Sequence, residues 1–179
     1  MLPRMSRIAR LAVLVVAGVG TLLVAPTAAH AASAIPNHPI CDDYKSYKVS
    51  SRKADQLIQT IPTVQLYNKG TTTATLSTSV AISGSVSLSV NASITVEASI
   101  IVAGAKGTIG ASATVTLSGT WTTSASVTVT SHHWGYIYGG IFRGVTVGTY
   151  EHIDTYCGVT KGTVTAYTPY RFGYIADGN

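Results

Sequence analysis

Polar and apolar residues alternate over an unusually long part of this chain. From Thr71 to Ser99 the odd positions carry small polar residues, with Ala81 as the exception, and most even positions carry Leu, Val or Ile. A period of two residues is typical of a β-strand. Because ordinary strands contain about five or six residues, this run predicts a strand far longer than a compact core needs. Such strands line a pore, stack into a fibre or extend as a rod.

A second alternating run, Thr108–Thr130, has the opposite parity: its even positions are polar and its odd positions are apolar or small. The segment Gly104–Gly107 between the runs has the composition of a loop, so we expect the two runs to form one antiparallel hairpin. Facing residues of such a hairpin lie on the same side of the sheet. The apolar positions are even in the first run and odd in the second. They therefore face each other only if the numbers of two facing residues add up to an odd value. A loop at 104–107 gives a value near 211, which places Val96 opposite Val115.

The predicted hairpin covers about residues 71–131 and has two chemically different faces. The apolar face consists of Val86, Leu88, Val90, Ile94, Val96, Ile100, Val102, Ile109, Val115, Leu117 and Trp121. The hydroxyl-rich face consists of Ser87, Ser89, Asn91, Ser93, Thr95, Glu97, Ser99, Ser112, Thr114, Thr116, Ser118 and Thr120.

Two short elements are expected before the hairpin. Ala54, Leu57 and Ile58 share one face at helical spacing, which predicts a short helix over 51–59 that ends before a proline. A strand over 63–67 follows, closed by the turn Asn68-Lys69-Gly70.

The C-terminal part is rich in Tyr, Trp and Phe. It predicts strands over 134–138, 141–150 and 162–168, broken by Gly139-Gly140, Gly158 and Pro169. These aromatic residues fit packing within a sheet; the alternative is a belt that contacts sugars or lipid headgroups. The whole pattern predicts a mainly β protein: an elongated antiparallel sheet with one long amphipathic β-hairpin and a short N-terminal helix.

The first 31 residues have the pattern of a secretory signal peptide. Arg4, Arg7 and Arg10 precede an apolar stretch, Leu11–Val24, that is too short for a membrane-spanning helix. A small-residue cleavage motif ends at Ala31. We therefore expect cleavage near Ala31, export from the cell, and a single secreted β-rich domain over 32–179.

Charge and cysteine content fit this expectation. Three of the twelve basic residues lie in the leader, which leaves nine against seven acidic residues, so the mature chain lacks the basic surplus of a nucleic-acid-binding protein. Cys41 and Cys157 are the two cysteines of the chain, and in an exported protein such a pair is expected to form a disulfide.

The sequence contains no G-x-S-x-G, Walker-loop, H-E-x-x-H or paired-carboxylate motif. The glycine-rich segment 104–110 joins two predicted strands with no helix after it, so it is not expected to hold phosphate. His132 and His133 are neighbours in a predicted strand and point to opposite faces, which argues against a shared metal ion. Glu151, His152 and Asp154 fit a solvated strand end better than a site. We expect no enzyme activity, no cofactor and no metal.

The organisation of residues 63–150 resembles that of the aerolysin-like β-pore-forming toxins, in particular the epsilon-toxin/mosquitocidal-toxin group. The resemblance is based on the opening Asn68-Lys69-Gly70-Thr71-Thr72, the two alternating runs, and the strand Val127–Tyr138 that follows. It implies that several subunits each contribute a hairpin to a membrane pore, with the apolar face toward lipid and the hydroxyl-rich face toward water. The chain departs from the family in lacking a receptor-binding domain and a proline after the second run.

A second interpretation remains open at this point. The predicted hairpin has low charge, high β-propensity and no proline. These properties also describe strands that pair edge to edge with strands of other chains. The chain would then be a non-enzymatic structural or adaptor subunit of a secreted assembly or cell-surface layer. In either case the expected partners are further copies of this chain or co-secreted subunits, with a target membrane in the first case.

Overall fold

The computed structural model describes residues 40–178, so the expected signal peptide lies outside the described residues. The described chain consists mainly of antiparallel strands, which confirms the prediction of a mainly β protein. In chain order the elements are β1 (Tyr44–Gln59), β2 (Val64–Tyr67), β3 (Ala74–Ser87), β4 (Ser89–Ala92), α1 (Ala98–Ile109), β5 (Thr116–Val129), β6 (Trp134–Ile153) and β7 (Val159–Gly178).

The larger of the two sheets is built around the hairpin of β6 and β7. It has five strands in the order β1-β6-β7-β4, and β2 pairs with the part of β6 that β1 leaves free. The predicted strand at 63–67 is thus confirmed as β2. The strands expected at 134–138 and 141–150 form one continuous strand, because Gly139 and Gly140 stay in the pairing with β7. Pro169 also lies within a strand, beside a register shift where a missing N–H is tolerated.

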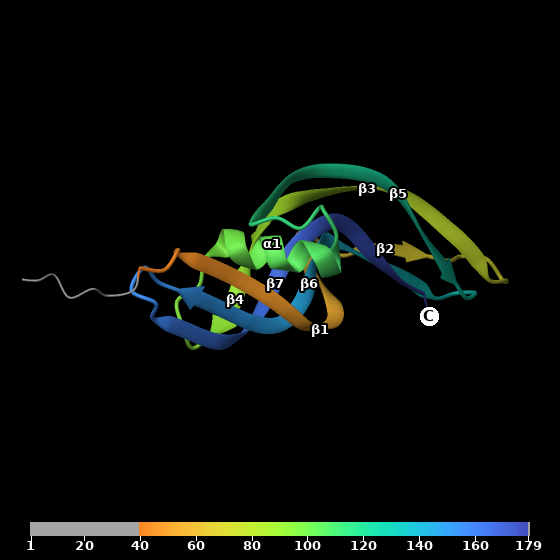
Figure 1. Ribbon diagram of the computed structural model, residues 1–179. Coiled ribbons are helices and arrows are strands. Elements are labelled where there is room, and N and C mark those ends of the chain that lie inside the picture. Colours follow the sequence, from red (N-terminus) through yellow and green to blue (C-terminus); the bar gives the residue numbers. More distant parts are fainter. Residues whose placement is uncertain (1–39, 179) are drawn as a thin grey trace, which may run out of the picture. The chain divides into compact units, whose positions relative to one another are not determined.

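The smaller sheet is a two-stranded ribbon formed by β3 and β5, which curves over the larger sheet (Figure 1). Ala74 faces Val129 and Ser87 faces Thr116, so paired residue numbers add up to 203. The predicted pairing of the two alternating runs and its odd parity are confirmed, but the expected value near 211 is wrong. A shift by an even number of residues leaves both faces unchanged, so alternation alone does not distinguish the two registers.

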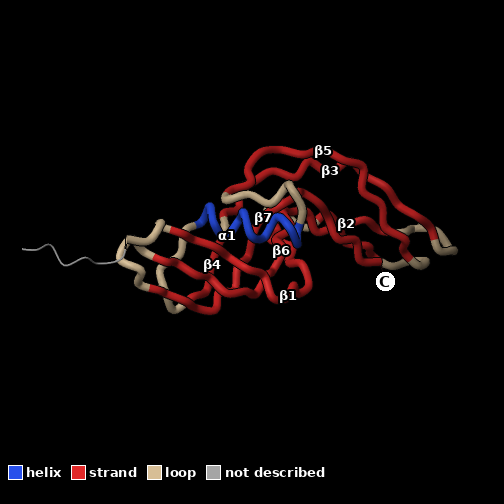
Figure 2. The backbone as a smooth tube through the Cα atoms, in the orientation of Figure 1, coloured by secondary structure: helices blue, strands red, loops and turns tan. Residues whose placement is uncertain are grey.

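The expected loop at 104–107 is wrong, because the segment lies inside helix α1 (Figure 2). The two long runs therefore do not pair along their whole length: residues 88–115 leave the ribbon and form β4, α1 and the connecting segments. Gly104 is needed for close packing of the helix on β1, since a Cβ atom there would lie 2.1 Å from the carbonyl oxygen of Tyr47. A glycine that indicated a turn in the sequence thus serves helix-to-sheet contact.

The short N-terminal helix predicted at 51–59 is also wrong, because these residues belong to β1. Two register shifts against β6, between Val49 and Ser51 and between Lys53 and Gln56, each add one residue to β1. Such bulges interrupt the two-residue period. Because of this interruption, Ala54, Leu57 and Ile58 follow one another at a spacing that resembles that of one face of a helix.

Two apolar clusters hold the elements together. The first joins the ribbon to the larger sheet and is centred on Ile82, Val129 and Ile137. The second lies under α1 and is centred on Tyr47, Ile101 and a set of small side chains of β7. Alternation along β6 assigns its odd residue Ile137 to the first cluster and its even residue Tyr150 to the second, so the two clusters lie on opposite faces of that strand.

The predicted disulfide between Cys41 and Cys157 is confirmed. It joins the segment before β1 to the loop between β6 and β7. Asp154 orders that loop, because its carboxylate accepts hydrogen bonds from the backbone N–H groups of Tyr156 and Gly158, both at 2.8 Å. A disulfide of this kind is compatible with an extracellular protein.

Candidate functional site

The outward face of the β3–β5 ribbon is a regular double row of Ser and Thr side chains. Every residue of the double row is exposed. The facing pairs are Thr75 and Thr128, Ser77 and Ser126, Ser79 and Ser124, Ala81 and Thr122, Ser83 and Thr120, Ser85 and Ser118, and Ser87 and Thr116. The inward face is mostly apolar, with Thr78 and Thr123 as its polar exceptions, and its apolar residues from Leu76 to Ile82 on β3 and from Ala125 to Val129 on β5 pack in the first cluster.

Within the ribbon, Gly84 of β3 faces Gly119 of β5. Both residues have positive φ angles, 154° and 143°, which L side chains rarely adopt. A Cβ atom on Gly84 would lie 2.7 Å from the Cβ atom of Thr60, so the ribbon approaches the end of β1 closely here. The two glycines thus let the ribbon follow the curvature of the larger sheet without a register shift.

Only part of the predicted apolar and polar faces lies on this ribbon. Of the predicted apolar face, Val86, Leu117 and Trp121 lie on β3 and β5; Leu88, Val90, Ile94, Val96, Ile100, Val102, Ile109 and Val115 lie in the segment 88–115. Of the predicted polar face, Ser87, Thr116, Ser118 and Thr120 lie on the ribbon; Ser89, Asn91, Ser93, Thr95, Glu97, Ser99, Ser112 and Thr114 lie in that same segment. The structure therefore divides each face between the ribbon and a differently folded segment.

Helix α1, in the middle of this segment, has a sequence with weak helix preference. Ile100, Ile101 and Val102 are β-branched and favour strands, and Gly104 and Gly107 each disfavour a helix by about 1 kcal/mol relative to Ala. The helix is stabilised instead by tertiary packing, because Ile101 is fully buried against the second cluster. Its conformation therefore depends on contact with the larger sheet.

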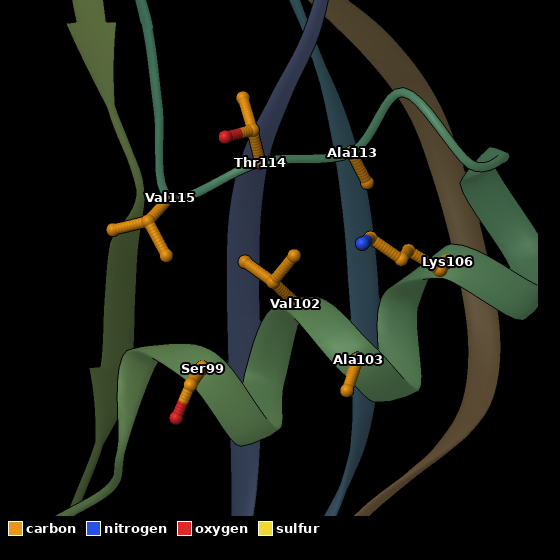
Figure 3. Close-up of a pocket in the computed structure, with 7 residues that line it drawn as sticks. All are labelled: Ser99, Val102, Ala103, Lys106, Ala113, Thr114 and Val115. Carbon is orange, nitrogen blue, oxygen red and sulfur yellow. The ribbon is translucent and has the colours of Figure 1, made fainter.

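The opposite side of α1 borders a pocket, although Val102 on that side is buried. A cavity of about 450 Å³ separates it from the segment that leads into β5 (Figure 3). The cavity is lined by Ser99, Val102, Ala103 and Lys106 of the helix and by Ala113, Thr114 and Val115.

Charged side chains hold the start of α1 to the larger sheet. Glu97, the residue before the helix, accepts a hydrogen bond from Lys45 Nζ at 2.5 Å, and Lys45 also lies 3.5 Å from Asp43. His152 Nε2 lies 2.9 Å from the carboxylate of Asp43. The hydrogen bond from His152, reinforced by the positive charge of Lys45, lowers the pKa of Asp43. The pKa of Lys45 is raised, chiefly by its hydrogen bond to Glu97.

The base of the ribbon is held by the buried side chain of Asn68. Its Nδ2 group donates to the carbonyl oxygens of Thr72, Val129 and Thr130 at 2.8, 2.9 and 3.1 Å, and its Oδ1 atom accepts from Gly70 N–H at 2.9 Å. One side chain thus connects the turn into β3 with the end of β5. This supports the expected turn at 68–70 and gives its first residue a structural role.

Sequence reasoning missed the part played by the N-terminal strand. Lys45 and Tyr47 of β1, which contact Glu97 and α1, lie more than fifty residues before the helix, and no local pattern links them to it. The predicted solvated strand end at 151–154 is only partly exposed. Glu151 pairs with Lys161 at 2.9 Å, while His152 and Asp154 make the separate contacts described above.

Within residues 40–178, no three His, Cys, Asp or Glu side chains are arranged to hold a metal ion. None of the helices in that part of the chain, α1 included, has the length and apolar character required to cross a membrane. In comparisons with known proteins, no family model, curated protein or solved structure matches this chain.

Proposed function

We propose that this protein is a secreted pore-forming protein of the aerolysin-like kind. In this proposal the segment 88–115 leaves the larger sheet and extends the β3–β5 ribbon into a long membrane-inserting hairpin. The apolar face of the hairpin contacts lipid and its hydroxyl-rich face lines the water-filled path. The fold described above is then the resting fold, before insertion.

The observation that carries this proposal is the register of the ribbon. The backbone N–H of Leu88 donates to the carbonyl oxygen of Val115 at 2.7 Å, so the pairing already continues one step beyond the last assigned pair. Continued further, the same register brings Val90 opposite Ala113 and Ile94 opposite Ile109. Every Leu, Val and Ile of the segment except Ile101 and Val102 then stays on one face, although in the resting fold these residues are divided between β4, α1 and their connections.

The two charges of the segment support the same register. Between Thr71 and Thr130, Glu97 and Lys106 are the only charged residues. Their numbers add up to 203, so the extended hairpin would pair them directly across its polar face, where opposite charges stabilise by about 0.2–1 kcal/mol. A register with the value 211 would leave both without an opposite charge. Glu97 would therefore exchange Lys45, its partner in the resting fold, for Lys106.

The dimensions of this hairpin suit a bilayer. A membrane-crossing strand needs about 9–11 residues, which the extended strands supply at 87–96 and 107–116. The paired charges then lie at the far interface, and Ile101 and Val102 form the tip. Since open strand edges are not tolerated in lipid, the hairpins of several subunits must pair with one another to close the pore.

The ribbon also has the edges that such an assembly requires. In the described residues β3 pairs only with β5, and neither strand contains a charged residue or a proline. Long uncharged edges of this kind are ready to pair with another chain. The same observation favours the second candidate function, a structural subunit that joins a secreted assembly through edge pairing without insertion.

Dye release from vesicles separates the two candidates, and a disulfide lock ties the result to the segment 88–115. Asn91 of β4 faces Thr165 of β7, and antiparallel facing pairs have Cα separations that suit a disulfide. The variant Asn91→Cys/Thr165→Cys should fold and release no dye until it is reduced. The matched control Ser77→Cys/Ser126→Cys crosslinks β3 to β5, which stay paired, and should leak when oxidised.

Wild-type protein treated with the same reductant controls for reduction of the native disulfide. The vesicles are phosphatidylcholine, phosphatidylcholine with phosphatidylserine, and phosphatidylethanolamine with phosphatidylglycerol. If the wild type releases no dye from any of them but forms larger assemblies in solution, the structural-subunit function replaces the pore.

A further inference from the structure

A row of aromatic side chains, two of them exposed and two half-buried, runs along one face of β6 and its neighbour β2. Trp134, Tyr136 and Tyr138 alternate along the strand and therefore share a face, and Tyr67 of β2 faces Trp134. Trp134 is 46% exposed and Tyr67 is 37% exposed. We call these four residues the aromatic row. From Trp134 to Tyr138 it spans about 13 Å, because a strand rises by about 3.3 Å per residue.

The rings are arranged by their mutual contacts. The centroids of Tyr67 and Trp134 lie 5.0 Å apart, and those of Tyr136 and Tyr138 lie 6.5 Å apart with an angle of 20° between the rings. The intervening residue Ile137 points into the first apolar cluster on the other face of the strand. The aromatic row is therefore not required to fill that cluster, which leaves its exposure to be explained by another role.

Polar side chains border Tyr136 on both sides, whereas Tyr138 faces the exposed Ile175 of β7. Gln65 of β2 and Asp177 of β7 are the register neighbours of Tyr136, so the three lie side by side across the sheet. Both Gln65 and Asp177 are exposed. Gln59, at the adjoining end of β1, has its amide nitrogen 2.8 Å from the carbonyl oxygen of Ile61, which orients the amide. The row thus combines aromatic rings with amide and carboxylate groups on one face of the sheet.

We propose that the aromatic row binds a neutral carbohydrate chain. The C–H face of a pyranose ring packs on Tyr and Trp rings, while the Gln65 amide and the Asp177 carboxylate bond to the hydroxyl groups at the ring edge. An open row on rigid strands suits a chain of several sugar rings better than a single sugar, which requires an enclosed pocket. The proposal does not depend on pore formation, since binding and leakage are measured separately.

The charge of the row argues for carbohydrate over an anionic membrane surface. The charged register neighbour of the row is Asp177, a carboxylate that repels phosphate headgroups, and no Lys or Arg faces Trp134, Tyr136 or Tyr138 across the described pairs. Surfaces that bind anionic lipid carry clustered Lys and Arg. The row also lies at the base of the ribbon, beyond the Ala74–Val129 pair and far from the segment 88–115.

The test uses the purified mature protein and four defined polysaccharides: cellulose, chitin, β-1,3-glucan and xylan. We expect retention on at least one, and saturable binding of the corresponding hexasaccharide in calorimetry. Trp134→Ala and Tyr136→Ala should each weaken binding by about tenfold or more, the loss typical of a truncated aromatic anchor. Tyr136→Phe, which keeps the ring, should bind almost as the wild type does.

Tyr156→Ala is the matched control, because Tyr156 is 79% exposed but lies in the loop between β6 and β7. It should bind as the wild type does, and near-ultraviolet circular dichroism checks that each variant is folded. Three results would overturn the proposal. They are no retention on any of the four polysaccharides, unchanged binding by both alanine variants, or binding only to phosphatidylcholine/phosphatidylserine vesicles that Trp134→Ala abolishes.

Discussion

Neighbouring substitutions at Val90 and Asn91 give the sharpest test of the extended hairpin. Val90 is 41% exposed on β4 and Asn91 is exposed beside it, so the resting fold should accept Arg at either position. Exposed substitutions of this kind usually change the free energy of unfolding by no more than about 0.5 kcal/mol. In the extended hairpin the two side chains point to opposite faces, Val90 to lipid and Asn91 to water.

The expected penalty follows from the depth of Val90. If the crossing strand is 87–96, Val90 lies close to its middle, where Arg facing lipid costs roughly 2–4 kcal/mol. Since 1.4 kcal/mol corresponds to a factor of ten, this is roughly a 30- to 1,000-fold loss of insertion per subunit. A ring of subunits multiplies the loss. Val90→Arg should therefore abolish dye release, whereas Asn91→Arg should leak and shift the pore toward anions.

The assay is calcein release from the vesicles named above, with thermal unfolding of each variant measured in parallel. Both variants should unfold within about 3 °C of the wild type. Reversal potentials in planar bilayers report the change in ion selectivity of Asn91→Arg. The reasoning is refuted if Val90→Arg leaks as the wild type does, or if Asn91→Arg blocks release to the same degree.

Three other predictions concern the contacts that hold the resting fold. Asn68→Ala should lower the free energy of unfolding by about 1–3 kcal/mol, measured by urea unfolding, because it leaves buried carbonyl groups without a donor; an unchanged midpoint would contradict its role at the ribbon base. Lys106→Glu should slow dye release by placing two carboxylates opposite each other, and Glu97→Lys/Lys106→Glu should restore the rate; failure of this rescue would exclude the 203 register. The hydrogen bond from His152 lowers the pKa of Asp43, so its stabilisation is present above the ordinary value of about 3.9 and is lost as pH falls through the lower value in the fold. Asp43→Asn should flatten the dependence of the unfolding midpoint on pH below about 4, and an unchanged dependence would show that Asp43 does not contribute.

The sequence by itself determined that the two strands of the ribbon place most of their apolar residues on one face and their hydroxyl-rich residues on the other. Alternation predicted strands, which holds for β3 and β5, and the change of parity between the two runs predicted an odd register, as the pairing of Ile82 with Trp121 confirms. It also indicated the disulfide between Cys41 and Cys157, since the two cysteines of a chain whose first residues have the pattern of an export signal are expected to pair. Alternation is a local property of the chain, and the disulfide follows from the number of cysteines. Neither prediction needed knowledge of distant contacts.

The tertiary structure decided where the ribbon ends and which segments become strand or helix. The residues of α1 join the two alternating runs and include the segment 104–107 that the sequence predicted as a loop, yet they form a helix that buries Ile101 against Tyr47 in the second apolar cluster. Conversely, residues 51–59 have the spacing of a helix, but β6 presents a free edge that they pair with through two bulges. In both places contacts made by distant residues outweighed local preference, because burial of a large side chain contributes more than helix or strand propensity.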